Sequence, residues 1–223
     1  MSSIEDAFRA LPSASLDERL ELLRMLVEHW YGPIEPGDGY AARDLGSEVM
    51  PRALRWWLTT VGGKRIFSQN HQRGRPLDVR ENGMLVFLVE NQGCFELATP
   101  VHGEDPSVWS CSFPANTWMC QEVPLSIALL HMLAVEIVLG APWSAWSDGD
   151  ASAEGDWLAK HFVEAKVPGL KVAPGGPARI FAGADVIAIV FTDGGGWIGA
   201  KDERLLDFLK ARPDTWERVE REW

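Results

Sequence analysis

Cysteine and histidine are scarce in this sequence, with three and five residues respectively in a chain of 223. Cys94, Cys111 and Cys120 are odd in number, and their spacing matches neither a disulfide framework nor the close cysteine pairs of zinc sites. No two histidines have the spacing of a helical metal motif. We therefore expect neither a structural metal nor a cofactor.

A secretory leader and a membrane-spanning segment are also missing. The first residues, MSSIEDAFRALPSAS, contain no basic segment followed by an apolar run. The most apolar stretch, 125–139, contains His131 and Glu136 and is shorter than the roughly 20 residues that span a bilayer. We expect a buried helix there, and the cytoplasm, where thiols stay reduced, as the compartment.

Positive charge is in short supply, because 21 basic residues face 32 acidic ones and leave a net charge of −11. A negative field repels phosphate backbones and anionic lipid surfaces, so neither nucleic acid nor a membrane is an expected partner. A basic protein or peptide fits this charge, and so does solubility alone. The 11 tryptophans suit a core and a protein interface alike.

Helix and strand signals come in groups and do not alternate. A capping-box pattern at Ser15 and Glu18 predicts a helix over 15–31, and Pro51 precedes a second helix. Shorter helices are expected at 157–165 and from 205 to Pro213. Strands are expected at 65–69, 84–90, 95–101, 106–111, 178–181, 185–192 and 197–200. This grouping predicts an α+β fold with a largely antiparallel or mixed β-sheet flanked by helices.

The polar, acidic stretch 144–156 is predicted to be a surface loop, and a domain boundary is possible at this place. The C-terminal part alone would be small and would leave open strand edges. Joining the main sheet is the simpler arrangement, so we predict a single domain over 1–223.

One glycine-rich segment, Gly194–Gly199, matches the dinucleotide-binding fingerprint letter for letter. That chemistry needs a helix whose N-terminus holds the pyrophosphate. Trp197 and Ile198 instead predict a strand, so a hairpin turn at 193–196 is the favoured interpretation.

A cysteine–histidine–acid site can be drawn from Cys94, His102 and Asp105. No helix N-terminus and no neighbouring cation activates Cys94 in the sequence. A chain of this length offers such triples by chance, so we predict no catalytic residue.

The polar group Glu90, Asn91 and Gln92 comes directly after an apolar strand. Carboxylate and amide groups are costly to bury without hydrogen bonds. These side chains therefore either tie neighbouring loops together, which we favour, or line a binding surface.

Three segments, in this order, carry a resemblance to a known family: MPRALRWW at 50–57, FLVENQG at 87–93 and EDPSVW at 104–109. They resemble the SUKH superfamily in a bacterial form. Its pattern is a proline-led helix, a hydrophobic strand ending in Glu-Asn-Gln-Gly, and then Asp-Pro-x-Val. The resemblance covers about 48–140, with a looser likeness in the C-terminal strands.

The resemblance implies a SUKH-like α+β fold without enzymatic activity. Many bacterial members resemble immunity proteins, which neutralise a cognate toxin by binding it, and eukaryotic relatives act as regulatory scaffolds. Gly93 and Pro106 are implied to shape turns, and Trp109 to anchor packing. The residues implied for partner binding or loop organisation are Glu90, Asn91, Gln92, Gly93, Asp105 and Trp109.

An acidic immunity protein suits a basic nuclease toxin, because complementary charge speeds association. The acids expected to form such a patch are Glu35, Asp38, Asp44, Asp148, Asp150, Glu154 and Asp156. A regulatory or scaffolding module with another protein partner is the first alternative. An enzyme or small-ligand binder with an unrecognised pocket is the second. The sequence predicts neither the toxin nor an oligomeric state.

Overall fold

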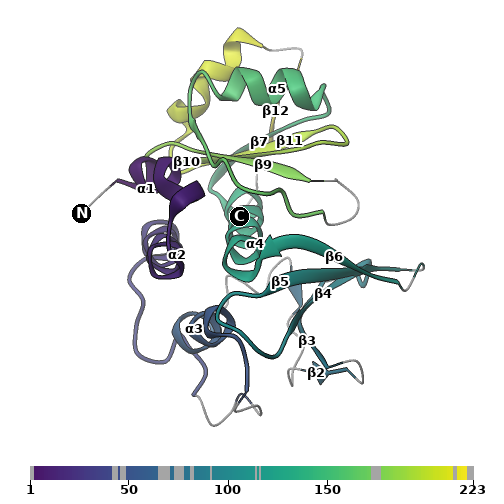
Figure 1. The fold of residues 1–223 in the computed structure, drawn as a ribbon. Helices are drawn as coiled ribbons and strands as arrows, with labels where there is room; N and C mark the ends of the chain where they lie inside the picture. The colour runs from purple at the N-terminus through teal and green to yellow at the C-terminus, as the bar shows by residue number, and fades with distance from the viewer. Residues whose placement is uncertain are drawn as a thin grey trace. The chain divides into compact units, whose positions relative to one another are not determined.

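A computed structural model describes most of the chain, and its helices and antiparallel sheets confirm the predicted α+β class (Figure 1). The chain divides into two compact units, described separately below. The central unit is Ser15–Leu130, and the terminal unit joins Met1–Ala14 to His131–Trp223. The described residues are 3–41, 45, 49–64, 71–72, 78–80, 83–90, 92–113, 115, 117–171, 177–212 and 215–219.

The central unit has two helices before its sheet. α2 (Leu16–Tyr31) begins after Ser15, whose hydroxyl accepts a hydrogen bond from the Glu18 N–H while the Glu18 carboxylate accepts one from the Ser15 N–H. The helix predicted over 15–31 is thus confirmed. α3 (Arg52–Thr60) follows Pro51, also as predicted, and buries its apolar face.

The central sheet is antiparallel, with strand order β1-β3-β4-β5-β6 and β2 paired to β3. β3 is buried over four consecutive residues, as its apolar sequence predicts for an inner strand. The sequence signals missed β6, and the strand predicted at 65–69 lies outside the described residues. The strands are β1 (His71–Gln72), β2 (Asp78–Val79), β3 (Met84–Glu90), β4 (Phe95–Pro100), β5 (Ser107–Ser112) and β6 (Thr117–Pro124).

Helix α4 (Leu125–Gly140) is the buried apolar helix that the sequence predicts. The division between the two units falls inside it, between Leu130 and His131, and not in the 144–156 stretch. Among the described residues, no helix combines the length and apolarity needed to cross a membrane.

The terminal unit has its own antiparallel sheet, with order β12-β7-β11-β10-β9-β8. The C-terminal strands therefore do not join the main sheet, which corrects that expectation. Neither side of this group of strands is left open, because β7 pairs with β11 and β8 pairs with β9, and β12, which the sequence signals missed along with β7, extends the sheet beyond β7. The strands are β7 (Trp143–Ser147), β8 (Val163–Glu164), β9 (Ala178–Ala182), β10 (Val186–Phe191), β11 (Gly196–Ala200) and β12 (Glu217–Val219).

The stretch 144–156 is not a loop, which is a second correction. It holds most of β7 and most of α5 (Ala151–Leu158), whose first turn is capped by the Asp150 carboxylate. The helix predicted at 157–165 is thus placed too late in the chain. The sequence does not indicate these elements, because β7 reads Trp-Ser-Ala-Trp-Ser without the two-residue alternation of a strand, and a capping aspartate resembles a loop residue.

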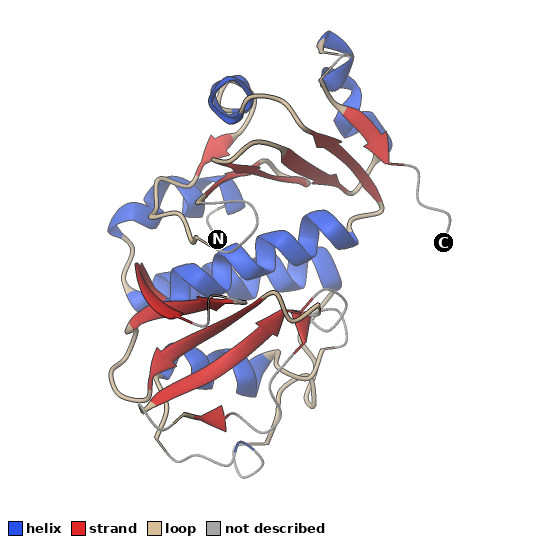
Figure 2. Cartoon of the chain, turned by 90° about the vertical axis from the view of Figure 1, so that its right-hand side faces the viewer, coloured by secondary structure: helices blue, strands red, loops and turns tan. Residues whose placement is uncertain are grey.

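Both faces of the terminal sheet are covered within this unit. Ala188 and Ile198 share a buried cluster with Leu158 of α5 and Leu206 of the 3-10 helix η4 (Glu203–Ala211). Figure 1 and Figure 2 both show α5 over this face. On the other face, a Cβ at Gly199 would lie 2.8 Å from Ala141 Cβ and 2.9 Å from Val138 Cα, so glycine permits α4 to lie directly on β11. The N-terminal helix α1 (Ile4–Ala10), another element that the sequence signals missed, contacts β8 and β9.

His131 is buried on α4, and its Nε2 lies 3.1 Å from the Pro168 carbonyl oxygen. A carbonyl oxygen only accepts, so Nε2 carries the proton. The interpretation of His131 as a hydrogen-bonded core residue is thus confirmed.

Replacing His131 by glutamine should flatten the acid side of the stability profile. Burial lowers the pKa of His131 to about 4 from 6.5, while the bond to Pro168 opposes this shift. Because the unfolded chain takes up the proton first, the contribution of neutral His131 is complete above pH 6.5 and is lost as the pH falls toward 4. Urea titrations across that range should show the wild-type free energy of unfolding falling more steeply than that of His131→Gln, by up to about 1.4 kcal/mol per pH unit. Equal slopes would contradict the assignment.

Candidate functional site

The Glu90 carboxylate organises the turn between β3 and β4. Its Oε2 accepts hydrogen bonds from the backbone N–H groups of Gln92, at 2.9 Å, and Cys94, at 3.1 Å. The Gly93 N–H donates to the Glu90 carbonyl oxygen at 2.8 Å, and Gly93 has a φ of 71°, which suits glycine. Asn91 lies outside the described residues. Glu90 therefore ties this loop together, as the favoured interpretation of the sequence predicts.

The loop before β5 supplies acceptors to the first turns of two helices. The Glu104 carbonyl oxygen accepts from the Ala53 N–H of α3 at 3.1 Å, and the Pro106 carbonyl oxygen accepts from the Leu125 N–H of α4 at 3.0 Å. First-turn N–H groups have no partner inside their own helix. This short loop thus closes the start of both helices.

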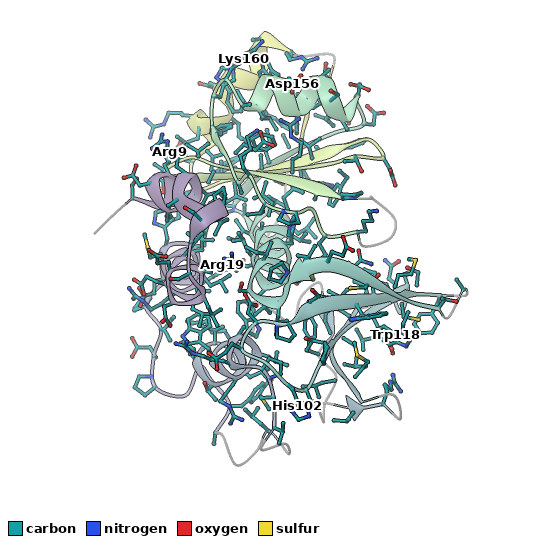
Figure 3. All side chains as sticks on the ribbon, viewed as in Figure 1. Arg9, Arg19, His102, Trp118, Asp156 and Lys160 are labelled. Carbon is teal, nitrogen blue, oxygen red and sulfur yellow. The ribbon has the colours of Figure 1, made fainter. Side chains whose placement is uncertain are left out.

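Asp105 is the charged member of that loop. Its Oδ1 accepts from the Ser126 N–H at 2.7 Å, and its Oδ2 accepts from the Ser126 hydroxyl at 2.6 Å. Arg19 of α2, labelled in Figure 3, places Nη1 3.3 Å from Oδ2. Both carboxylate oxygens are therefore engaged in holding helices.

The Cys94, His102 and Asp105 triple draws no support from these contacts. A catalytic acid would have to orient the histidine, whereas Asp105 bonds to Ser126 and Arg19. Cys94 and His102 are both exposed. Among the residues described, no group of three or more His, Cys, Asp or Glu side chains could hold a metal ion.

Trp109 is half-buried on β5, between Ala98 of β4 and Cys120 of β6. The fully buried positions of this strand are Val108, Ser110 and Cys111. The packing role implied for Trp109 stays a prediction.

The acids expected to form one patch are distributed over both units. In the central unit, Glu35 is exposed and Asp44 lies outside the described residues. Asp38 is 2.9 Å from Lys64 Nζ, and hydrogen bonds from Lys64 and from the Glu35 N–H lower the Asp38 pKa. Asp38 is thus engaged in loop structure.

In the terminal unit, Asp148 and Asp150 are exposed before α5, and Asp150 Oδ1 accepts from the Ala153 N–H at 2.8 Å. Asp156, labelled in Figure 3, is 72% exposed and 3.4 Å from Arg179 Nη1. Glu154 is 1% exposed, so its assignment to a surface patch is wrong.

Glu154 is buried because it holds the C-terminal segment against α5. Its Oε2 accepts from the Trp216 indole Nε1–H at 2.5 Å. Arg212 Nη1 lies 3.0 Å from Oε1, as an ion pair without good hydrogen-bond geometry. Both partners lie far along the chain, so no local pattern predicts this burial.

The sequence signals also missed an exposed edge at β6. Met119 is 53% exposed and Phe113, in the β5–β6 turn, is 45% exposed. The signal available was the uncharged run Thr117–Gln121, which mixes aromatic, apolar and polar residues.

Searches against protein-family models, curated proteins and solved structures found no match. The likeness to the SUKH superfamily therefore rests on the three segments alone. The contacts at 90–93 and 104–106 give those segments a structural role.

Asp105→Ala should lower the free energy of unfolding by about 1–2 kcal/mol, because the first turn of α4 loses its acceptor. Glu104→Ala is the matched control, because that side chain is 71% exposed and should cost under about 0.5 kcal/mol. Urea denaturation measures both values. A null effect of Asp105→Ala on stability would refute the capping role.

Glu154→Ala should lower the free energy of unfolding by about 3 kcal/mol, because Arg212 loses its ion-pair partner and the Trp216 N–H loses its buried acceptor. Asp156→Ala, on the same helix but exposed, should stay within about 0.5 kcal/mol of wild type. Thermal denaturation with near-UV circular dichroism tests this pair. Similar losses in the two variants would show that Glu154 is not the buried anchor.

Proposed function

We propose that this chain is a non-catalytic protein-binding protein, of the immunity type that neutralises a toxin by binding it. The observation that carries the proposal is the open edge of the central sheet at β6. The likeness to the SUKH superfamily and the acidic charge support the choice of partner.

β6 ends the strand order of the central sheet, and no described strand of that unit pairs with its outer side. Natural edge strands usually carry charges, prolines or bulges that block pairing with other chains. In β6, such features are present at the C-terminal end of the strand: the charged Glu122, which has a φ of 54°, and Pro124. The first five residues, Thr117–Gln121, carry no charge.

Side chains of this edge are exposed on both faces of the strand. Thr117 and Met119 are exposed on one face, and Cys120 on the other, where Trp118, labelled in Figure 3, is half-buried. Together with Phe113, they offer apolar area along an edge that no described strand of this unit covers. Partners that add a strand to a sheet use this combination, with backbone bonds giving affinity and side chains giving specificity.

The partner that fits the charge is a basic protein. A net charge of −11 accelerates encounter with a positively charged surface. A basic nuclease toxin has such a surface, since it must bind phosphate. A regulatory scaffold would use the same edge with another protein, and the identity of the neighbouring gene separates the two.

The test is binding between this chain and the toxin encoded beside its gene. We expect a stable complex at physiological salt and faster association at low salt. Calorimetry and stopped-flow mixing measure the two effects. If no complex forms at either salt concentration, the immunity role is wrong.

Met119→Lys tests the edge, because a charge there opposes strand pairing and should weaken the complex about tenfold or more. Val79→Lys is the matched control: Val79 is 49% exposed on β2, the strand that pairs with β3 away from β6. The control should change affinity less than about twofold. Equal losses would place the interface elsewhere.

A further inference from the structure

A cavity of about 370 Å³ lies in the terminal unit, beside the turn that joins β10 to β11. Three aromatic residues and two carboxylates line it, together with the glycine backbone of the turn. The aromatic residues are Trp146, Phe191 and Trp197, and the acids are Asp148 and Asp193. Every described residue that lines it belongs to the terminal unit.

The two tryptophans are placed by the sheet. Trp146 of β7 and Trp197 of β11 are direct cross-strand partners, with ring centroids 6.5 Å apart and ring planes at 33°. Phe191 ends β10 on the same side of the sheet, because alternate residues of a strand share a face. Both indoles are half-buried, so each keeps part of its ring accessible.

The glycines bring the backbone close to this group. Gly194 and Gly195 have φ values of 104° and 83°, and the Gly195 N–H lies 3.3 Å from the Gly149 carbonyl oxygen. A Cβ at Gly195 would lie 3.0 Å from the Ser147 carbonyl oxygen. The segment that resembles a dinucleotide fingerprint is therefore a hairpin turn, as predicted, and it forms one wall of the cavity.

The charges of the cavity are both negative. Asp148 and Asp193 are exposed, and in the part of the chain that the structure describes neither forms an ion pair. Indole faces attract cations through their quadrupole. Carboxylates beside such rings add direct attraction and accept hydrogen bonds. The lining therefore selects a cation.

Among cations, a guanidinium group fits both halves of the lining. It is planar and weakly hydrated, so it stacks on indole rings, and its N–H donors match carboxylate oxygens. A quaternary ammonium has no N–H for the two aspartates, and a lysine ammonium is more costly to dehydrate. Free arginine adds an α-carboxylate, which Asp148 and Asp193 repel, and an α-ammonium, which is costly to dehydrate.

We propose that this cavity binds the side chain of an arginine presented by another protein. The inference stands apart from the proposed function, because the edge strand β6 belongs to the central unit and the cavity to the terminal unit. Either can fail without the other.

The experiment is an NMR titration of the full chain with a blocked peptide, acetyl-Gly-Arg-Gly-amide, at physiological salt. The peptide should shift the Trp146 and Trp197 indole N–H signals, assigned by Trp→Phe variants, in a saturable way below about 10 mM. The citrulline peptide, a neutral isostere, should bind at least about tenfold more weakly. Free arginine and choline should also bind more weakly than the arginine peptide.

The double variant Asp148→Asn with Asp193→Asn should weaken peptide binding about tenfold or more while thermal denaturation stays unchanged. Asp156→Asn removes the same kind of charge from an exposed site outside the cavity and should change affinity less than about twofold. Equal binding of the citrulline peptide, tighter binding of choline or free arginine, or equal losses in the Asp156 control would each overturn the proposal. So would the absence of saturable shifts in the folded wild type.

Discussion

Two helices of the central unit begin against the same short loop, and the rest of that unit is arranged around this constraint. The loop directly precedes β5, which lies between β4 and β6 in the sheet. The hydrogen bonds from the first-turn N–H groups of α3 and α4 to this loop therefore also position β5. Asp105 strengthens the junction with a carboxylate at a helix N-terminus, where negative charge is favoured. The edge strand follows directly from this junction, since β6 runs into α4 without a loop.

The acidic residues divide into those that hold the fold and those left free. Four acids fix a loop, a turn or a helix by accepting hydrogen bonds or forming ion pairs: Asp38, Glu90, Asp105 and Glu154. The net charge therefore overstates how many carboxylates are available to bind a basic partner. Asp148 and Asp193, which line the aromatic cavity, make no such contact among the described residues. Their carboxylates therefore remain accessible to a cationic ligand.

Sequence reasoning succeeded where the signal is local. The capping box at Ser15 and the apolar run of β3 each determine their element within a few residues, and both boundaries are confirmed within a residue. It failed over 144–156, where small residues without a two-residue alternation and a capping aspartate resemble a polar loop. Whether that stretch becomes a strand depends on pairing with β11 and β12, which lie about 50 and 70 residues further along.

The sequence by itself determined the fold class, the main helices and inner strands, and the acidic charge, because periodicity, caps and composition act over short distances. Tertiary structure alone decided which acids are buried, how the strands divide into two sheets, and where tryptophans and aspartates meet. The physical reason is separation along the chain. Asp105 finds Ser126 across 21 residues and Glu154 finds Trp216 across 62, and no local pattern records which distant donor a carboxylate will meet.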